Sequence, residues 1–94
     1  MIELNKLETA SEMLKAIAHP IRIAVVGMLD DNKKLNVTEI HEALNIEQAV
    51  ASHHLSILKN KGVLLSERSG KNCYYSLKHQ RLSQIVACID KCQE

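Results

Sequence analysis

Residues 38–62 read TEIHEALNIEQAVASHHLSILKNKG and contain two helix-like stretches separated by a short turn. The first helix is predicted over residues 38–44 and the second over residues 47–61, where apolar side chains recur at helical spacing. Two helices joined by a short turn form the arrangement called a helix-turn-helix. This pair of helices is the centre of the predicted fold.

The ends of both helices carry residues that suit a helix end. Thr38 is the predicted N-cap of the first helix, because its hydroxyl can accept a hydrogen bond from a free backbone N–H group. Three residues on, where a capping box would have Glu or Gln, the sequence has His41. Asn45 is predicted to end the first helix and Gly62 the second, since glycine readily adopts the left-handed cap conformation.

A β-hairpin is predicted directly after the second helix. Residues 63–68 and 72–77 have the pattern of strands, and Ser69-Gly70-Lys71 between them supplies a glycine turn. Arg68 and Lys71 flank the glycine. The tip of the hairpin is therefore expected to be basic.

Three further helices and a short strand complete the prediction. Helices are expected over residues 5–18, 20–30 and 79–91, and a strand over residues 35–37. Pro20 suits the first turn of a helix, where its missing N–H group is not needed. The element order α-α-β-α-α-β-β-α, mostly α with a small β-hairpin wing, predicts a winged helix-turn-helix.

The chain is short, with 94 residues, of which 46% are hydrophobic and 24% charged. We expect a single domain spanning residues 1–94, since so short a chain cannot close a second core. With no Phe, no Trp and two Tyr, the core has to be aliphatic and modest. A second copy of the chain is expected to complete it, which makes the protein a homodimer.

Cysteine usage and hydropathy indicate the compartment. Three cysteines, an odd number, argue against a secreted disulfide framework and for thiols in a reducing compartment. The longest uncharged apolar runs, such as residues 23–29, are far shorter than the roughly 20 residues of a membrane span. We therefore expect a cytoplasmic protein with no membrane partner.

Charge is distributed unevenly along the chain, although the net charge is only +1. Residues 1–47 hold eight acidic and five basic residues, whereas residues 59–81 hold six basic residues and one acidic residue, Glu67. The second stretch is able to meet phosphates. The alternative is a solvated basic surface without a ligand.

The helix over residues 47–61 is predicted to have two different faces, because successive residues point about 100° apart. The inner face comprises Val50, His54, Leu55 and Leu58. The outer face is small and polar and comprises Gln48, Ala49, Ser52, His53 and Ser56. Such a face suits a DNA major groove, where Gln pairs with adenine and Ala contacts a thymine methyl group. Arg68 and Lys71 of the hairpin are expected to contact the phosphates beside it.

Three blocks carry a resemblance that covers nearly the whole chain. They are residues 14–23 (LKAIAHPIRI), 48–55 (QAVASHHL) and 70–75 (GKNCYY). In residues and order they resemble the arsenic-repressor (ArsR) family of bacterial regulators. The resemblance implies a DNA-binding transcription regulator with a winged helix, which dimerises through its first and last helices. His54 is expected to be packed and hydrogen-bonded, and Arg22 to form a structural ion pair.

Many members of this family release DNA when a metal binds, and the resemblance implies two places for a metal site. One would need cysteines where this chain has Asn36 and Thr38, so a soft-metal site is not expected there. The other lies on the last helix, where His79 and Cys92 match ligand positions but Arg81 stands in place of a ligand.

Cys88 and Cys92 are four residues apart and fall on one face of the last helix, close enough to bind one ion together. Three interpretations stay open for them. The first is a site for zinc or another thiophilic metal, with His79, Cys88 and Cys92 as candidate ligands. The second is a redox sensor, and the third is structural packing. Cys73, within a predicted strand, is expected to pack.

The expected mechanism is repression by occlusion of a palindromic operator in double-stranded DNA. A homodimer would place two recognition helices about one DNA turn apart, and an effector acting at the last helix would release it. The alternative is a winged-helix module that binds proteins, with no steep dependence on salt. An enzyme is not expected, since the sequence has no Gly-rich phosphate loop and no HExxH motif.

Overall fold

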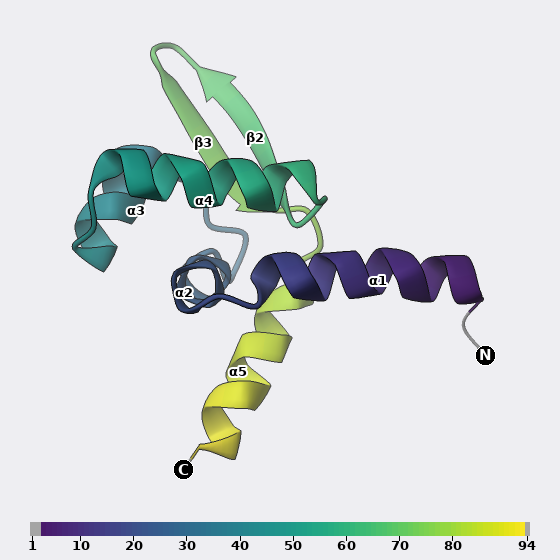
Figure 1. Ribbon diagram of the computed structural model, residues 1–94. Helices are drawn as coiled ribbons and strands as arrows, with labels where there is room; N and C mark the ends of the chain where they lie inside the picture. Colours follow the sequence, from purple (N-terminus) through teal and green to yellow (C-terminus); the bar gives the residue numbers. More distant parts are fainter. Residues whose placement is uncertain (1–2, 94) are drawn as a thin grey trace.

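The computed structural model describes residues 3–93, and within them the predicted elements follow in the predicted order (Figure 1). The helices are α1 (Leu4–Ile17), α2 (Pro20–Met28), α3 (Val37–Leu44), α4 (Gln48–Asn60) and α5 (Leu82–Cys92). The strands are β1 (Leu35–Asn36), β2 (Leu64–Ser69) and β3 (Asn72–Leu77). The mostly helical winged helix-turn-helix fold is therefore confirmed.

The N-cap of α3 differs from the prediction. Asn36, not Thr38, caps the helix: its side chain accepts a hydrogen bond from the backbone N–H of Glu39 at 2.8 Å. The Glu39 carboxylate in turn accepts from the backbone N–H of Asn36 at 3.0 Å. This is a complete capping box, in which two free N–H groups are satisfied at once. Thr38 lies inside the first turn and has no capping role.

The start of α5 also differs, because the helix begins at Leu82 and not at His79. The preceding residues form a turn in which the backbone N–H of Leu82 donates to the carbonyl oxygen of His79 at 3.0 Å. The Ser83 hydroxyl donates to the carbonyl oxygen of Gln80 at 2.9 Å. His79 therefore lies ahead of the helix that carries the two C-terminal cysteines.

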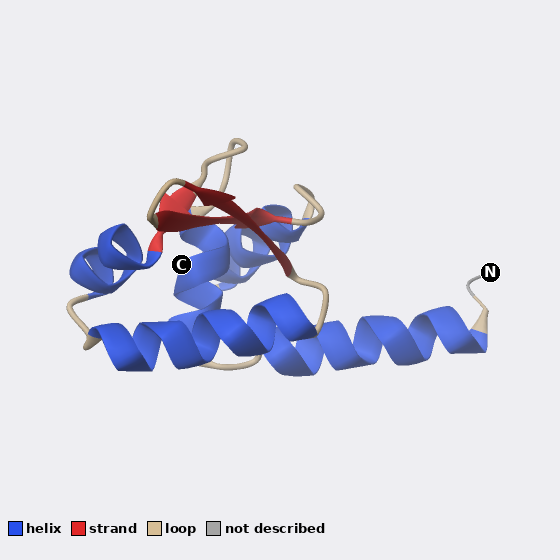
Figure 2. Ribbon diagram, turned by 90° about the horizontal axis from the view of Figure 1, so that it is seen from above, coloured by secondary structure: helices blue, strands red, loops and turns tan. Residues whose placement is uncertain are grey.

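The wing is an antiparallel hairpin. β2 pairs with β3 from Leu64 opposite Leu77 to Ser69 opposite Asn72, and Gly70 adopts the left-handed φ of 62° that the tight turn requires. β1 adds to the free edge of β3, so the strand order is β1-β3-β2. Figures 1 and 2 show the hairpin projecting beside α4.

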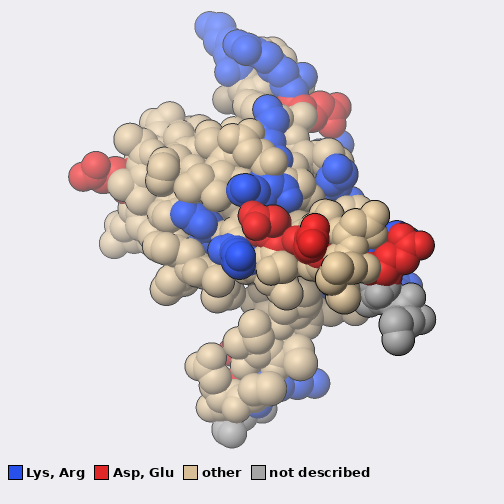
Figure 3. Space-filling model, turned by 45° about the vertical axis from the view of Figure 1, so that its right-hand side comes forward, with Lys and Arg blue, Asp and Glu red and all other residues tan. Residues whose placement is uncertain are grey.

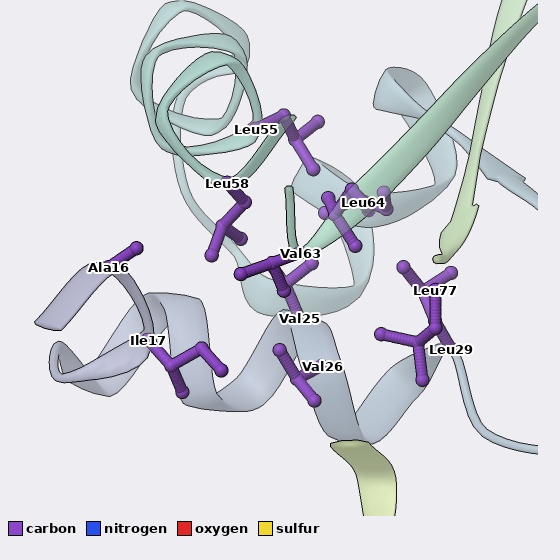
Figure 4. Packing of buried hydrophobic residues seen from close by; sticks show 11 residues of the cluster. Ala16, Ile17, Val25, Val26, Leu29, Leu55, Leu58, Val63, Leu64 and Leu77 are labelled. Carbon is purple, nitrogen blue, oxygen red and sulfur yellow. The ribbon is translucent and has the colours of Figure 1, made fainter. Parts of the chain in front are cut away.

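Aliphatic side chains from four helices and the hairpin meet in one core, as Figure 4 shows. The buried residues are Ala16, Ile17, Val25, Val26, Leu29, Ile40, Leu55, Leu58, Val63, Leu64 and Leu77. Leu55 and Leu58 of α4 are fully buried, and burial of each such side chain contributes about 1.5–3 kcal/mol. The inner face of α4 is thus held firmly, which fixes the direction of its outer face.

α1 and α5 extend beyond this core. Ala16 and Ile17 are the buried residues of α1, and α5 buries none of its residues in the single chain. In Figures 1 and 2, α1 runs away from the other elements toward the N-terminus, and in Figure 1 α5 points away from the wing. Among residues 3–93, no helix combines the length and the apolar character of a membrane span.

Candidate nucleic-acid interface

The outer face of α4 is open to solvent. All five residues predicted for DNA reading on this helix are exposed: Gln48, Ala49, Ser52, His53 and Ser56. Their spacing places them together on the side opposite the buried Leu55 and Leu58. The side chains are short or planar, so the helix backbone is able to come close to a groove wall.

Val50 was wrongly predicted to lie on the inner face of α4. Its side chain is 37% exposed, whereas the next residue, Ala51, is 1% exposed and takes the inner position. The two residues point about 100° apart, which is enough to move a side chain from the core to the flank of the outer face. Val50 is therefore an additional candidate for DNA contact, of an apolar type that suits a thymine methyl group.

His54 is buried, at 7% exposure, and hydrogen-bonded, as expected. Its Nδ1 accepts a hydrogen bond from Nε of Arg22 in α2 at 3.0 Å. The predicted ion pair of Arg22 is wrong, because an η nitrogen of Arg22 donates at 3.1 Å to the carbonyl oxygen of Ala16 rather than to a carboxylate. A helix-terminal carbonyl and a neutral imidazole are good acceptors for a guanidinium, which only donates. The signal that sequence reasoning missed is the free carbonyl at the end of α1.

The rings of His19 and His53 lie near His54, with centroids 4.5 and 5.6 Å away. Burial lowers the pKa of His54, and the charges of His19, Arg22 and His53 lower it further. His19 also caps α2, since its Nδ1 accepts from the backbone N–H of Ile21 at 3.1 Å. His53 points outward from α4, so the two adjacent histidines lie in different environments.

The tip of the wing is basic. Arg68 and Lys71 are exposed on either side of the Gly70 turn, and Lys and Arg side chains gather at the end of the wing at the top of Figure 3. Glu67, the acidic residue of the hairpin, is bridged to Lys34 at 3.0 Å. Its negative charge is thereby partly compensated, and the wing tip keeps a positive potential.

The two outlying helices expose apolar side chains. On α1 these are Leu4, Leu7 and Leu14, and on α5 they are Ile85 and Ile89. Leu4 is 71% exposed, which is a large apolar area to leave in water. Both helices were predicted to form the dimer interface.

The three candidate metal ligands are not brought together by one chain. His79 precedes α5, and Cys88 and Cys92 lie exposed on the helix with free thiols. Within residues 3–93, no three His, Cys, Asp or Glu side chains are close enough to hold a metal ion. Cys73 is half-buried beside Tyr75, whose pKa is raised by burial and then by Cys73.

The sequence matches the family model described as "Bacterial regulatory protein, arsR family" over residues 19–66, which include α2, α3 and α4. The transcriptional repressor PagR of Bacillus anthracis is 37% identical over 92 residues, which cover 98% of this chain and 92% of PagR. The HTH-type transcriptional repressor SmtB of Mycobacterium tuberculosis is 42% identical over 80 residues. These cover 85% of this chain and 58% of SmtB.

Solved structures have the same fold. The crystal structure of PagR aligns with a TM-score of 0.82 and covers 93% of this chain and 99% of the PagR chain. HlyU from Vibrio cholerae N16961, 25% identical, aligns with a TM-score of 0.82 and covers 97% of each chain. The family match contains the helix-turn-helix whose outer face is open to solvent. The chain therefore belongs to the arsR family of bacterial regulatory proteins and is a DNA-binding transcription regulator.

Proposed function

We propose that the protein is a homodimeric repressor that occupies a palindromic operator and so blocks transcription. The observation that carries this proposal is the polar outer face of α4 beside a wing with a basic tip. Gln48, Ala49, Ser52, His53 and Ser56 would read base edges in the major groove, while Arg68 and Lys71 would contact phosphates. The protein would act in the cytoplasm, without enzymatic activity.

The homodimer is proposed from the exposed apolar side chains of α1 and α5. A second copy would cover Leu7, Leu14, Ile85 and Ile89 and supply the core area that a chain without Phe or Trp lacks. Two-fold symmetry would place the two α4 helices in successive major grooves, about 34–36 Å apart. An operator with two inverted half-sites matches that symmetry.

The test of this function is binding to the DNA upstream of the protein's own gene. A labelled promoter fragment should bind at least about a thousandfold more tightly than random DNA of the same length. Gln48→Ala should weaken promoter binding by about 1–3 kcal/mol and relax the preference at one base pair. Gln84→Ala, at an exposed position of α5, is the matched control and should bind as the wild type does.

Equal affinity for promoter and random DNA would contradict the repressor proposal. Binding of a protein partner with little dependence on salt would instead favour the module that binds proteins. Measuring the binding at several salt concentrations therefore separates the DNA-binding function from the protein-binding function in one experiment.

We also propose that α5 carries the response to a thiol-directed effector, such as zinc or another thiophilic ion. Cys88 and Cys92 are exposed, free and on one face of the helix, so both thiolates are able to reach one ion. Further ligands, with His79 as the candidate, would have to come from the partner chain. Zinc should release promoter DNA from the reduced wild type, and the double variant Cys88→Ser, Cys92→Ser should keep its DNA at the same zinc concentration. An equal response of both proteins would contradict this site.

A further inference from the structure

A single guanidinium joins the recognition helix to two other helices. Arg22 extends from α2, donates from Nε to Nδ1 of His54 on α4 at 3.0 Å, and donates from an η nitrogen to the carbonyl oxygen of Ala16 at 3.1 Å. Ala16 lies near the end of α1, the helix with the exposed apolar side chains. Arg22 therefore connects the proposed dimer helix to the helix that would read DNA.

This connection requires His54 to be neutral. A guanidinium has donors and no acceptor, so Nδ1 of His54 has to be the unprotonated nitrogen, with the proton on Nε2. An imidazolium carries a proton on both nitrogens. Protonation of His54 would therefore remove the acceptor and bring a second cation against Arg22 at hydrogen-bonding distance.

The groups packed around His54 make its protonation still less favourable. The nearest ring is His19 at the start of α2, and its Nδ1 is already an acceptor for the backbone N–H of Ile21. The ring of His53, on α4 itself, is the next. All three charge-bearing neighbours, His19, Arg22 and His53, disfavour a positive charge on His54, and so does burial.

Within residues 3–93, no carboxylate forms a salt bridge with His54. On α1, Glu12 is bridged to Lys61 at 3.4 Å, and on β2, Glu67 is bridged to Lys34 at 3.0 Å. On α3, the His41 ring is hydrogen-bonded to the carbonyl oxygen of Ile46 at 3.1 Å. Within the described residues, Arg22 is therefore the hydrogen-bond partner of the buried imidazole, and no acidic group is among the causes that shift the pKa of His54.

We propose that Arg22 and His54 are positioning residues for DNA binding: neutral His54 helps to hold α4 in place against α1 and α2, and its protonation shifts α4 relative to them, so that acid weakens the DNA complex. This inference rests on the proposed reading of DNA by α4. Base contacts depend on hydrogen bonds that weaken steeply with distance and angle. A small displacement of α4 relative to the dimer helices is therefore enough to reduce operator affinity.

The test uses a variant that keeps the acceptor but cannot take up a proton. Asn in place of His54 offers an amide oxygen close to the position of Nδ1. Operator affinity of the wild type and of His54→Asn should be measured from pH 7.5 to pH 5.5 at constant ionic strength. The wild type should lose affinity progressively relative to His54→Asn as the pH falls, by up to about tenfold for each unit by which DNA binding lowers the pKa of His54 further.

His53→Asn is the matched control, since it makes the same replacement one residue away, outside the Arg22 bond. It should keep the acid-induced loss. Arg22→Met should bind operator more weakly at pH 7.5 and show a smaller loss on acidification, because the opposing guanidinium is gone. Parallel pH curves for wild type and His54→Asn, or a loss that disappears in His53→Asn alone, would overturn the proposal.

A second measurement does not depend on DNA or on the folding of a variant. In the wild-type protein followed by NMR, the ring signal of His54 should titrate below the ordinary histidine range, and α4 amides should lose protection from exchange with the same midpoint. Unchanged α4 amides through that titration would overturn the proposal. Failure of the repressor function has a different signature: no preference for promoter DNA at pH 7.5, with the α4 amides still responding to the titration of His54.

Discussion

Neutralising the wing tip should change how DNA binding depends on salt. Arg68 and Lys71 are exposed, and within residues 3–93 neither takes part in a salt bridge. Each phosphate contact adds about 0.9 to the slope of log K against log salt concentration. With two such side chains on each of two wings, the double variant Arg68→Gln, Lys71→Gln should reduce the slope of the dimer by about 3.6.

The assay is fluorescence anisotropy of a labelled promoter fragment in a salt series from about 50 to 200 mM. The matched control is Arg81→Gln with Lys91→Gln, which removes one Arg at the N-cap of α5 and one Lys from its last turn, outside the hairpin. Its slope should stay that of the wild type. An unchanged slope in the wing variant, or an equal reduction in the control, would refute phosphate contact by the wing.

Further predictions concern the interface, the helix cap, base reading and acid stability. Leu14→Glu should yield monomers in sedimentation velocity, because the new carboxylate would be buried in the proposed dimer without a partner. Asn36→Ala should lower the free energy of unfolding by about 1 kcal/mol in denaturant titration, whereas Thr38→Ala should change it by less than about 0.5 kcal/mol. Val50→Ser should abolish a preference for thymine over uracil in the operator, measured by competition between the two DNAs. The free energy of unfolding should fall as the pH drops below about 6.5, because the unfolded chain then binds a proton at His54 more readily than the folded chain, in which the pKa of His54 is lowered. Urea titrations at two pH values should show a smaller fall for His54→Asn.

The elements were predictable because their signals are local. Helical spacing, Pro20 at the start of α2, and the glycine turns at Gly62 and Gly70 depend on residues close in sequence, and each of these features is present in the structure. The exact N-cap of α3 was not predictable in the same way. Asn36 and Thr38 are both good capping residues, and the choice depends on Glu39, which stands three residues after Asn36 and only one after Thr38.

The site was predictable where a residue lies well inside one face of a helix. Leu55 and Leu58 are buried and Ser52 is exposed, as their spacing indicates. Val50 lies at the border between the faces, where the packing of other elements, rather than spacing, decides exposure. The partner of Arg22 was not predictable either, because its acceptor on α4 is 32 residues away along the chain and is a histidine rather than an acid.

Protonation of the two adjacent histidines of α4 should change the affinity for DNA in opposite directions. An imidazolium at exposed His53 would add positive charge to the surface that approaches phosphates, and salt would screen that gain. An imidazolium at His54 would break the bond to Arg22 and displace every base-reading side chain of the helix together. The gain concerns one contact per half-site, whereas the loss affects all contacts of α4 in both half-sites. The net effect of acid should therefore be release of DNA, and removing His53 should make that release more complete.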